Sequence, residues 1–215
     1  LVNYNRDHYP THSLGPVISW LDIGCGDYYA TATSTATASK GINAYFARTF
    51  GPDHPGATRE YAQGDIVTTV IETYGGKSIV INYDMQLPRP YDNRWEVSGT
   101  LGVYNEQRDS VCLMGEDPKA HNWEPFAPHQ SKHDHAWYTT PIEGGHGGTD
   151  YLELREVVRA VRDRTQTPID VYDSVAMSVI VALSEKSIAR GSKPVKCPDF
   201  TRGKWKTNSP SFGVV

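Results

Sequence analysis

Three short segments of the sequence concentrate side chains that could carry out chemistry. The first is HYPTHSLGP, which places His8, Tyr9, Thr11 and His12 at the start of an apolar pattern with helical spacing. Side chains at a helix start can converge with backbone N–H groups on an anionic or hydroxylated ligand. Since histidine titrates near neutral pH, His12 could act as a general acid or base. The segment leaves a structural alternative open, in which Thr11 only caps the helix while Tyr9 and His12 pack.

The other two segments place a tyrosine and a histidine in rigid or glycine-rich surroundings. In LPRPYDNRW, Tyr91 follows a proline and lies between two arginines, a setting suited to stacking or to hydroxyl recognition at a strand end. A solvent-facing hairpin connection is the alternative. In EGGHGGTD, His146 lies between paired glycines that allow the backbone to approach a ligand closely. A flexible hinge before a helix explains the same pattern.

Two further patterns suggest chemistry that their context argues against. WLDIGCGD resembles the Gly-rich cofactor turn of methyltransferases, but helical spacing precedes it and alternating residues follow it. The turn is therefore expected to leave a helix and enter a strand, the reverse of a cofactor turn. HQSKHDHAW contains His133, Asp134 and His135, yet it has the character of a loop and lacks the spacings of small zinc sites. We expect no metal there.

The composition indicates a soluble globular protein and excludes several function classes. The chain has 215 residues, and its formal charge of −4 gives no reason to expect a nucleic-acid partner. No apolar run approaches the roughly 18 residues of a membrane span. Cys25, Cys112 and Cys197 are odd in number and far apart, which argues against a disulfide scaffold. The chain begins at Leu1 without a Met or a signal peptide, so we expect an upstream part, and the compartment stays open.

The elements that must position the three segments follow from hydrophobic periodicity. Leu14, Val17, Ile18 and Leu21 have helical spacing and predict a helix over the first segment. After it we expect, in chain order, a strand over 28–39, a helix over 41–50, a hairpin with strands over 65–74 and 77–85, strands over 94–100, 101–106 and 109–114, an irregular segment over 115–148, and helices from about 150 and over 170–190.

The helix starts carry their own signals. Thr11 or Ser13 can cap the first helix, and Asp150, with Glu153 in capping-box position, can cap the helix from about 150. The last helix is expected to start near Asp170. The apolar stripe of the helix from about 150 consists of Tyr151, Leu154, Val157, Val158 and Val161.

Consecutive strands in the middle of the chain, with helices before and after them, predict an α+β fold. We expect an open antiparallel or mixed β-sheet with helices packed on one face. The parallel βαβ alternation of a nucleotide-binding domain is missing from the pattern, and no G-x-G-x-x-G follows an expected strand.

Taken in order, these motifs resemble the C-terminal half of family 109 glycoside hydrolases, which belong to the Gfo/Idh/MocA oxidoreductase superfamily. The resemblance covers nearly the whole chain, because several unrelated motifs fall in series. They are YPTHSLGPV, WLDI, GINAYFARTFGPDHP, LPRPY, GGHGGTDY, VYDSVAMS and PDFTRGKW. The resemblance implies the C-terminal domain type of that superfamily for residues 1–215, as a substrate-binding and oligomerisation domain. The N-terminal Rossmann domain of the family would lie upstream of Leu1.

The resemblance also implies an unusual hydrolysis. In that reaction a tightly held NAD, bound mainly by the missing N-terminal domain, oxidises a sugar hydroxyl at C3. The resulting ketone acidifies the C2 proton, and the glycosidic bond is then lost by elimination. Water adds to the product of elimination, and the hydride returns from the cofactor. Such a reaction does not need the paired carboxylates of ordinary glycosidases. The matching substrate-contacting positions are Tyr9, Pro10, Thr11, His12 and Tyr91, with His12 and Tyr9 as catalytic candidates. His146 is added from its own glycine setting and not from the family.

Three functions remain open at this point. The first is the substrate-binding half of an NAD-dependent glycosidase, similar to α-N-acetylgalactosaminidases and inactive as this chain alone. The second is a sugar dehydrogenase of the same superfamily. The third is an isolated oligomerisation or sugar-binding domain without catalysis. The expected partners are a sugar or glycoside and further copies of the chain, which would bind through the sheet face that the helices leave open; neither nucleic acid nor a membrane is expected. The sequence leaves the sugar and its linkage undecided.

Overall fold

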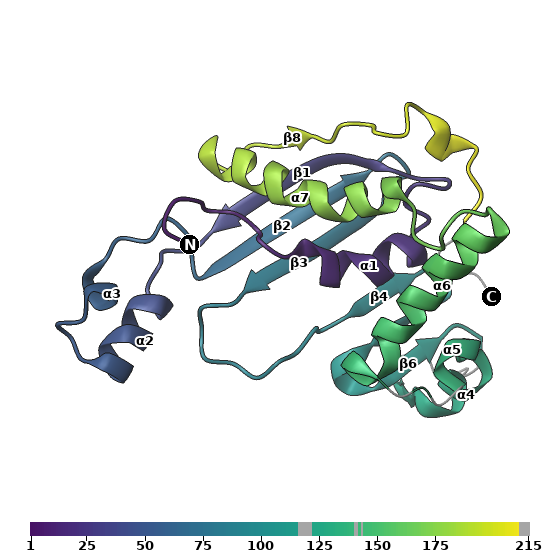
Figure 1. Ribbon diagram of the computed structural model, residues 1–215, viewed down its shortest axis with the longest axis horizontal. Helices are drawn as coiled ribbons and strands as arrows, with labels where there is room; N and C mark the ends of the chain where they lie inside the picture. Colours follow the sequence, from purple (N-terminus) through teal and green to yellow (C-terminus); the bar gives the residue numbers. More distant parts are fainter. Residues whose placement is uncertain (116–121, 140–141, 143, 211–215) are drawn as a thin grey trace. The chain divides into compact units, whose positions relative to one another are not determined.

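The computed structural model describes residues 1–115, 122–139, 142 and 144–210, and the chain divides into two compact units (Figure 1). The first unit combines residues 1–89 with the segment that starts at Gln166, and the second comprises residues 90–165. Each unit has a β-sheet of its own.

The first unit is built on a four-stranded antiparallel sheet with the strand order β3-β2-β1-β8. Its strands are β1 (Tyr29–Ala36), β2 (Ile66–Thr73), β3 (Ser78–Asp84) and β8 (Val195–Lys196). The predicted hairpin is confirmed, since β2 and β3 pair in continuous register around a turn in which Gly76 has a φ of 79°. A positive φ at this position favours glycine.

Two helices, α1 (Pro10–Trp20) and α7 (Val171–Ala189), pack side by side over one face of this sheet (Figure 1). The alternation in β2 explains which face they cover, because every second residue of the strand is buried. Leu14 and Ile180 are fully buried between the helices and the sheet. The other large side chains of this core are Ile18, Ile23, Tyr28, Tyr29, Ile71, Ile79, Ile81 and Leu183.

The opposite face of the sheet carries both polar and β-branched apolar side chains. Thr33 of β1, Val70 of β2 and Val80 of β3 lie in register across it, and Val80 is 60% exposed. Helices α2 (Gly41–Phe50) and α3 (Pro55–Thr58) connect β1 to β2. The predicted helix over 41–50 is thus confirmed, although none of its residues is buried.

The second unit holds another antiparallel sheet, with the strand order β4-β5-β6-β7. Its strands are β4 (Glu96–Gly99), β5 (Gly102–Asn105), β6 (Ser110–Leu113) and β7 (Glu124–Pro125). Its helices are α4 (Ala127–His133), α5 (Ala136–Thr139) and α6 (Thr149–Asp163), with the short 3₁₀ turns η1 (Glu106–Arg108) and η2 (Gly145–Gly148). The α+β class is confirmed, and the strands expected over 65–114 divide between two sheets.

Several local expectations about these elements are wrong. Helix α1 begins at Pro10 with Tyr9 as its N-cap, so Thr11 and Ser13 lie inside the helix and do not cap it. Proline suits this first position because the N–H that it lacks has no partner there anyway. Helix α6 has Gly148 as its N-cap, so Asp150 lies in its first turn. The irregular segment over 115–148 contains β7, α4, α5 and η2, while Pro118, Pro141 and Glu143 lie outside the described residues.

The two long helices near the C-terminus differ in what they bury. The predicted start near Asp170 is confirmed, because Asp170 and Asp173 form a capping box at the start of α7. The expected stripe of α6 is exposed to between 44% and 75%, at Tyr151, Leu154, Val157, Val158 and Val161. Glu156 and Ala160 are the buried residues of α6. Within the described part of the chain, no helix has the length and apolarity to cross a membrane.

Candidate functional site

The start of α1 presents two aromatic rings to solvent. Tyr9 is 53% exposed, His12 is also exposed, and their ring centroids lie 4.8 Å apart at an angle of 58°. Pro10 between them is buried and Thr11 is half-buried, so the backbone is anchored while the two functional side chains remain accessible. Four adjacent predicted site residues are thereby brought together on one helix turn. A phenol and an imidazole this close can bind a hydroxyl group and exchange a proton with it.

The segment before this turn is fixed by contacts to residues far along the chain. The backbone N–H of Asp7 donates to Oγ of Ser184 on α7 at 3.0 Å, and Asp7 is 2% exposed. Its Oδ1 accepts the backbone N–H of Tyr9 at 3.1 Å. Burial raises the pKa of the Asp7 carboxyl to about 6, against the smaller lowering effect of the Tyr9 N–H.

Arg6 ties the same segment to two other elements. Its backbone N–H donates to Oε1 of Gln63 at 3.1 Å, and its guanidinium donates to Oε2 of Glu185 on α7 at 2.9 Å. The side-chain oxygen of Asn5 accepts the N–H of Gly64 at 3.0 Å. These bonds hold the N-terminal segment against the loop before β2 and against α7. They therefore fix the position of the backbone from which α1 begins.

His8 and His12 are close in sequence but differ in their surroundings. The His8 ring packs on the Tyr83 ring of β3 with centroids 5.8 Å apart. Burial, and next the positive charge of Arg6, lower the pKa of His8, which favours a neutral ring. His12 is the exposed member of the pair. The structure therefore assigns packing to His8 and leaves His12 available to a ligand.

The Gly-rich turn of residues 22–27 leaves α1 and enters β1, as the sequence predicts. Its amides donate to oxygens of the chain itself: Gly24 N–H to Asp27 O at 2.8 Å, Cys25 N–H to Asp22 O at 3.1 Å and Gly26 N–H to Trp205 O at 2.7 Å. Because these donors are engaged within the chain, they are not available to a phosphate.

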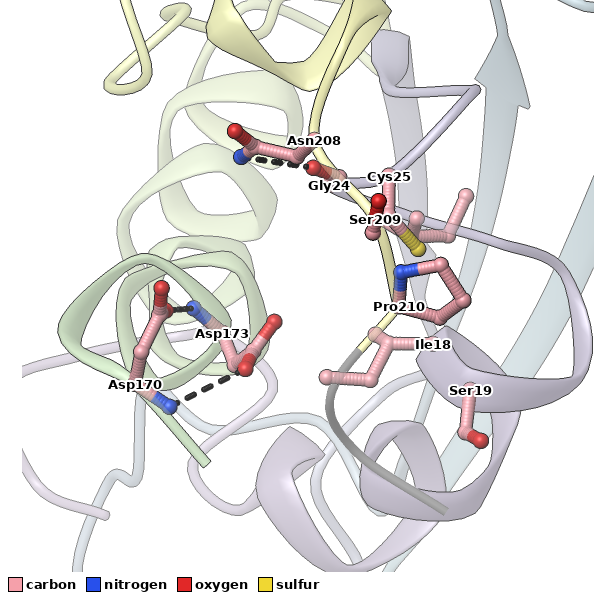
Figure 2. A pocket seen from close by; sticks show the side chains of 10 residues that line it. Ile18, Ser19, Gly24, Cys25, Asp170, Asp173, Asn208, Ser209 and Pro210 are labelled. Carbon is pink, nitrogen blue, oxygen red and sulfur yellow. Dashed lines mark hydrogen bonds between the residues drawn. The ribbon is translucent and has the colours of Figure 1, made fainter. Parts of the chain in front are cut away.

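A small cavity lies beside this turn, next to the start of α7 (Figure 2). Its volume of about 40 Å³ fits a few water molecules and not a sugar ring. The side-chain amide of Asn208 donates to Gly24 O at 3.2 Å, and Asp173 accepts the N–H of Asp170 at 3.0 Å (Figure 2). The polar side chains that line the cavity thus bind the C-terminal segment and cap α7. We therefore assign the cavity a structural role.

The remaining predicted site residues belong to the second unit. Tyr91 is 83% exposed, and His146 lies in η2 with a φ of 50° and a side chain that is 84% exposed. Nδ1 of His146 lies 2.9 Å and 3.0 Å from the two carboxylate oxygens of Asp150. The hydrogen bond that the His146 ring donates to Asp150, and next the charge of Asp150, raise the pKa of His146. Asp150 therefore holds the histidine instead of capping α6.

Two histidines of the segment HQSKHDHAW have local structural roles. His133 ends α4, and Nδ1 of His135 accepts the N–H of Trp137 at 3.0 Å. In residues 1–115, 122–139, 142 and 144–210, no three His, Cys, Asp or Glu side chains are grouped in a way that could hold a metal ion. The three cysteines are free thiols.

Sequence reasoning missed the contribution of Asp7. The only local signal is its position two residues before Tyr9, from which a carboxylate can accept the Tyr9 N–H in an Asx turn. Its second partner, Ser184, lies 177 residues further along the chain. No periodicity or motif connects positions at that separation.

Comparison with known protein families covers almost the entire chain. The family model described as glycosyl hydrolase 109, C-terminal domain, matches residues 1–207. An α-N-acetylgalactosaminidase of Tannerella forsythia is 39% identical over 217 residues, which are 99% of this chain and 46% of that protein. A glycosyl hydrolase family 109 protein of Parabacteroides distasonis is 37% identical, with the same shares covered. The chain thus spans about half the length of the curated relatives it matches.

Solved structures share the fold at low sequence identity. A levoglucosan dehydrogenase in complex with NADH and L-sorbose has a TM-score of 0.57 at 16% identity, over 90% of this chain and 50% of that one. A myo-inositol dehydrogenase of Lactobacillus casei, in complex with NAD(H) and myo-inositol, has a TM-score of 0.55 at 13% identity, over 96% and 53%. The fold is therefore that of the C-terminal domains of Gfo/Idh/MocA oxidoreductases.

Proposed function

The chain belongs to the glycosyl hydrolase 109 C-terminal domain family, and from this premise we propose that it is the substrate-binding half of an NAD-dependent glycosidase. The observation that carries the proposal is the exposed Tyr9–His12 pair, whose rings lie 4.8 Å apart and whose preceding segment is bonded to Ser184 and, through the Asp7 side chain, to Tyr9. The sugar is of the α-N-acetylgalactosaminide type, as in the relative from Tannerella forsythia.

The sugar would be oxidised at C3, lose its glycosidic bond by elimination, add water and be reduced again. NAD would supply the oxidising power and return the hydride. The glycine turn at 22–27 does not fit a pyrophosphate, because its amides are bonded within the chain. We therefore propose that NAD is held mainly by the part of the protein that lies outside this chain, and that this chain alone is inactive.

The residues of this chain would bind and orient the sugar and move protons. The imidazole of His12 would take or give a proton at a hydroxyl or at the C2 position, since its ring is exposed and its nitrogens can both accept and donate a proton. The Tyr9 hydroxyl would donate to the same sugar, while Pro10 and Thr11 fix the turn that carries both rings. Tyr91 and His146 are proposed as further substrate contacts, and both side chains are exposed.

A second proposal concerns assembly. The face of the first sheet that α1 and α7 leave open carries β-branched residues in register, among them half-buried Thr33 and Val70 and exposed Val80. We propose that copies of the protein associate through this face, because such a surface can pair with its own copy. Sedimentation of the full protein would give an oligomer; a monomer at high concentration would contradict the assembly and leave the glycosidase proposal intact.

Activity of the full protein tests the glycosidase proposal and separates it from the alternatives. With an aryl α-N-acetylgalactosaminide, we expect release of the aryl group in the presence of bound NAD and no accumulation of NADH. Stoichiometric NADH from a free sugar would instead favour a sugar dehydrogenase. If the protein shows neither activity on a panel of glycosides and sugars, the remaining function is that of a binding or oligomerisation domain.

A further inference from the structure

Asp7 is a buried carboxyl group at the junction of three segments of the first unit. Its backbone N–H binds Ser184 of α7 at 3.0 Å, and its Oδ1 binds the N–H of Tyr9 at 3.1 Å. Since Tyr9 is the N-cap of α1, the second bond lies directly at the helix start. A single side chain thus fixes the residue that begins the proposed sugar site.

This helix start has no side-chain cap of the ordinary kind. Tyr9 makes no side-chain cap bond. The acceptor for the Tyr9 N–H comes from two residues upstream, in an Asx turn. Loss of the Asp7 side chain therefore removes the acceptor that orients the backbone between Asp7 and Tyr9.

The groups that face Asp7 leave its charge weakly compensated. One of these groups is Tyr83 of β3. Burial, and next the charge of Asp7, raise the pKa of the Tyr83 hydroxyl. Ser184 comes from α7, and Arg6 and His8 flank Asp7 on its own segment. The guanidinium of Arg6 is paired with Glu185 at 2.9 Å. Burial dominates, and it raises the pKa of Asp7 to about 6.

We propose that Asp7 is a positioning residue whose ionised carboxylate holds Tyr9 and His12 at the sugar and releases them in part when it takes up a proton. A charged acceptor makes a stronger hydrogen bond than a neutral one, so protonation weakens the bond to the Tyr9 N–H. The inference rests on the proposed function for the identity of the ligand and on the hydrogen-bond geometry for the role of Asp7.

The bond itself can be tested without any activity. In the full protein labelled with ¹⁵N-tyrosine, the amide resonance of Tyr9 should shift with pH around a midpoint of about 6. The shift should vanish in Asp7→Asn, whose side-chain oxygen accepts the same bond without titrating. Asp53→Asn, at an exposed loop position, is the matched control and should leave the titration unchanged. A Tyr9 amide that does not titrate in the wild type would overturn the proposal.

The pH profile of turnover tests the consequence. In wild-type protein, kcat should fall as pH drops through about 6, whereas Asp7→Asn should lose this acid limb and hold kcat at about the level that the wild type reaches once Asp7 is protonated. Asp7→Ala should lower kcat by at least about tenfold across the range, with a smaller change in KM, because a charge-assisted bond contributes roughly 1.5–3 kcal/mol, and 1.4 kcal/mol corresponds to tenfold. A merely structural role would change Tm but not the acid limb.

The two proposals fail in different ways. A wild-type protein with no activity on glycosides would contradict the proposed function, whatever the Tyr9 amide does. An active wild type whose acid limb persists unchanged in Asp7→Asn, or whose kcat survives in Asp7→Ala, would overturn the role of Asp7 and leave the glycosidase proposal standing.

Discussion

Helices α1 and α6 each begin beside a histidine that the sequence singles out, His12 and His146, and the two helix starts differ in what holds them. The start of α1 is bonded to α7 and to the loop before β2 through Asp7 and Arg6. The start of α6 is held by the local pair of His146 and Asp150, over four residues of the chain. A helix start that is fixed from distant elements can place a proton-transfer group accurately, whereas a locally held one suits a contact that adapts to its ligand.

The largest difference should appear when the two histidines are removed from the full protein. His12→Ala should lower kcat by about 10²–10⁴, since that is the typical contribution of one positioned acid or base, and should leave Tm nearly unchanged because the ring is exposed. His146→Ala should raise KM by at most about tenfold, because an exposed hydrogen-bonding ring contributes little more than that.

Steady-state kinetics and thermal melts of both variants check this contrast. If His12→Ala keeps near-normal turnover while its Tm falls by several degrees, His12 is a structural residue. If His146→Ala loses more turnover than His12→Ala, the proton-transfer role belongs to the second unit and the comparison is reversed.

The buried carboxyl of Asp7, next to the start of α1, should make the stability of the folded protein depend on pH. Burial raises the pKa of Asp7 to about 6 in the folded protein, from its ordinary value of 3.8. The folded state therefore binds the proton more tightly, and the free energy of unfolding should fall as pH rises from about 4 to about 6, by up to about 3 kcal/mol at 1.36 kcal/mol per pKa unit. Asp7→Asn should remove this loss, so its Tm should exceed that of the wild type at pH 8. A lower Tm for Asp7→Asn at pH 8 would show that the carboxylate is stabilised in the fold.

The stability of the start of α6 should depend on the backbone conformation of Gly148. Gly148 has a φ of 94°, and a Cβ at this position would lie 2.7 Å from the carbonyl oxygen of Ile142. Gly148→Ala should therefore destabilise the start of α6 by about 1–3 kcal/mol, measured as faster hydrogen exchange of the α6 amides. Gly51→Ala is the control, because its φ of 97° is as strained and no atom lies within 4 Å of the added Cβ. Equal effects would assign the cost to φ alone.

The smallest effects should come from the tyrosine hydroxyls. Tyr9→Phe and Tyr91→Phe should each raise KM by about two- to tenfold, the value of one neutral hydrogen bond, without a change in Tm. Tyr138→Phe, at another exposed tyrosine of the second unit, should have no effect on KM. An unchanged KM in Tyr91→Phe would remove Tyr91 from the site and confine the substrate contacts to α1 and His146.

Local pattern predicted the fold where the determinants are local. The β2–β3 hairpin, helix α2 and the capped start of α7 follow from β-branched runs, helical spacing and the acidic pair Asp170 and Asp173. The strands divide between two sheets because β3 and β4, which follow each other in the chain, do not pair, and periodicity does not specify which strands pair. The apolar residues of α6 show the same limit, because their spacing specifies a face and not whether a neighbour covers it.

The candidate site could be predicted in part for the same reason. Tyr9, Pro10, Thr11 and His12 are adjacent in sequence, so any structure keeps them together. The support from Asp7 and Ser184 depends on packing between α7 and the segment before α1, and nothing in the sequence pattern links them. His8 and His12 likewise look alike as residue types, and the Tyr83 ring against His8 is what separates a packing role from an exposed one.

The central claim is that this chain binds the sugar for a reaction that passes through loss of the C2 proton. Its most direct test is turnover of an α-N-acetylgalactosaminide by the full protein in D₂O, followed by NMR of the released sugar. Elimination and water addition exchange the C2 proton with solvent, so the account predicts deuterium at C2 of the product. Release of the sugar with its C2 protium fully retained would show direct hydrolysis and contradict the account.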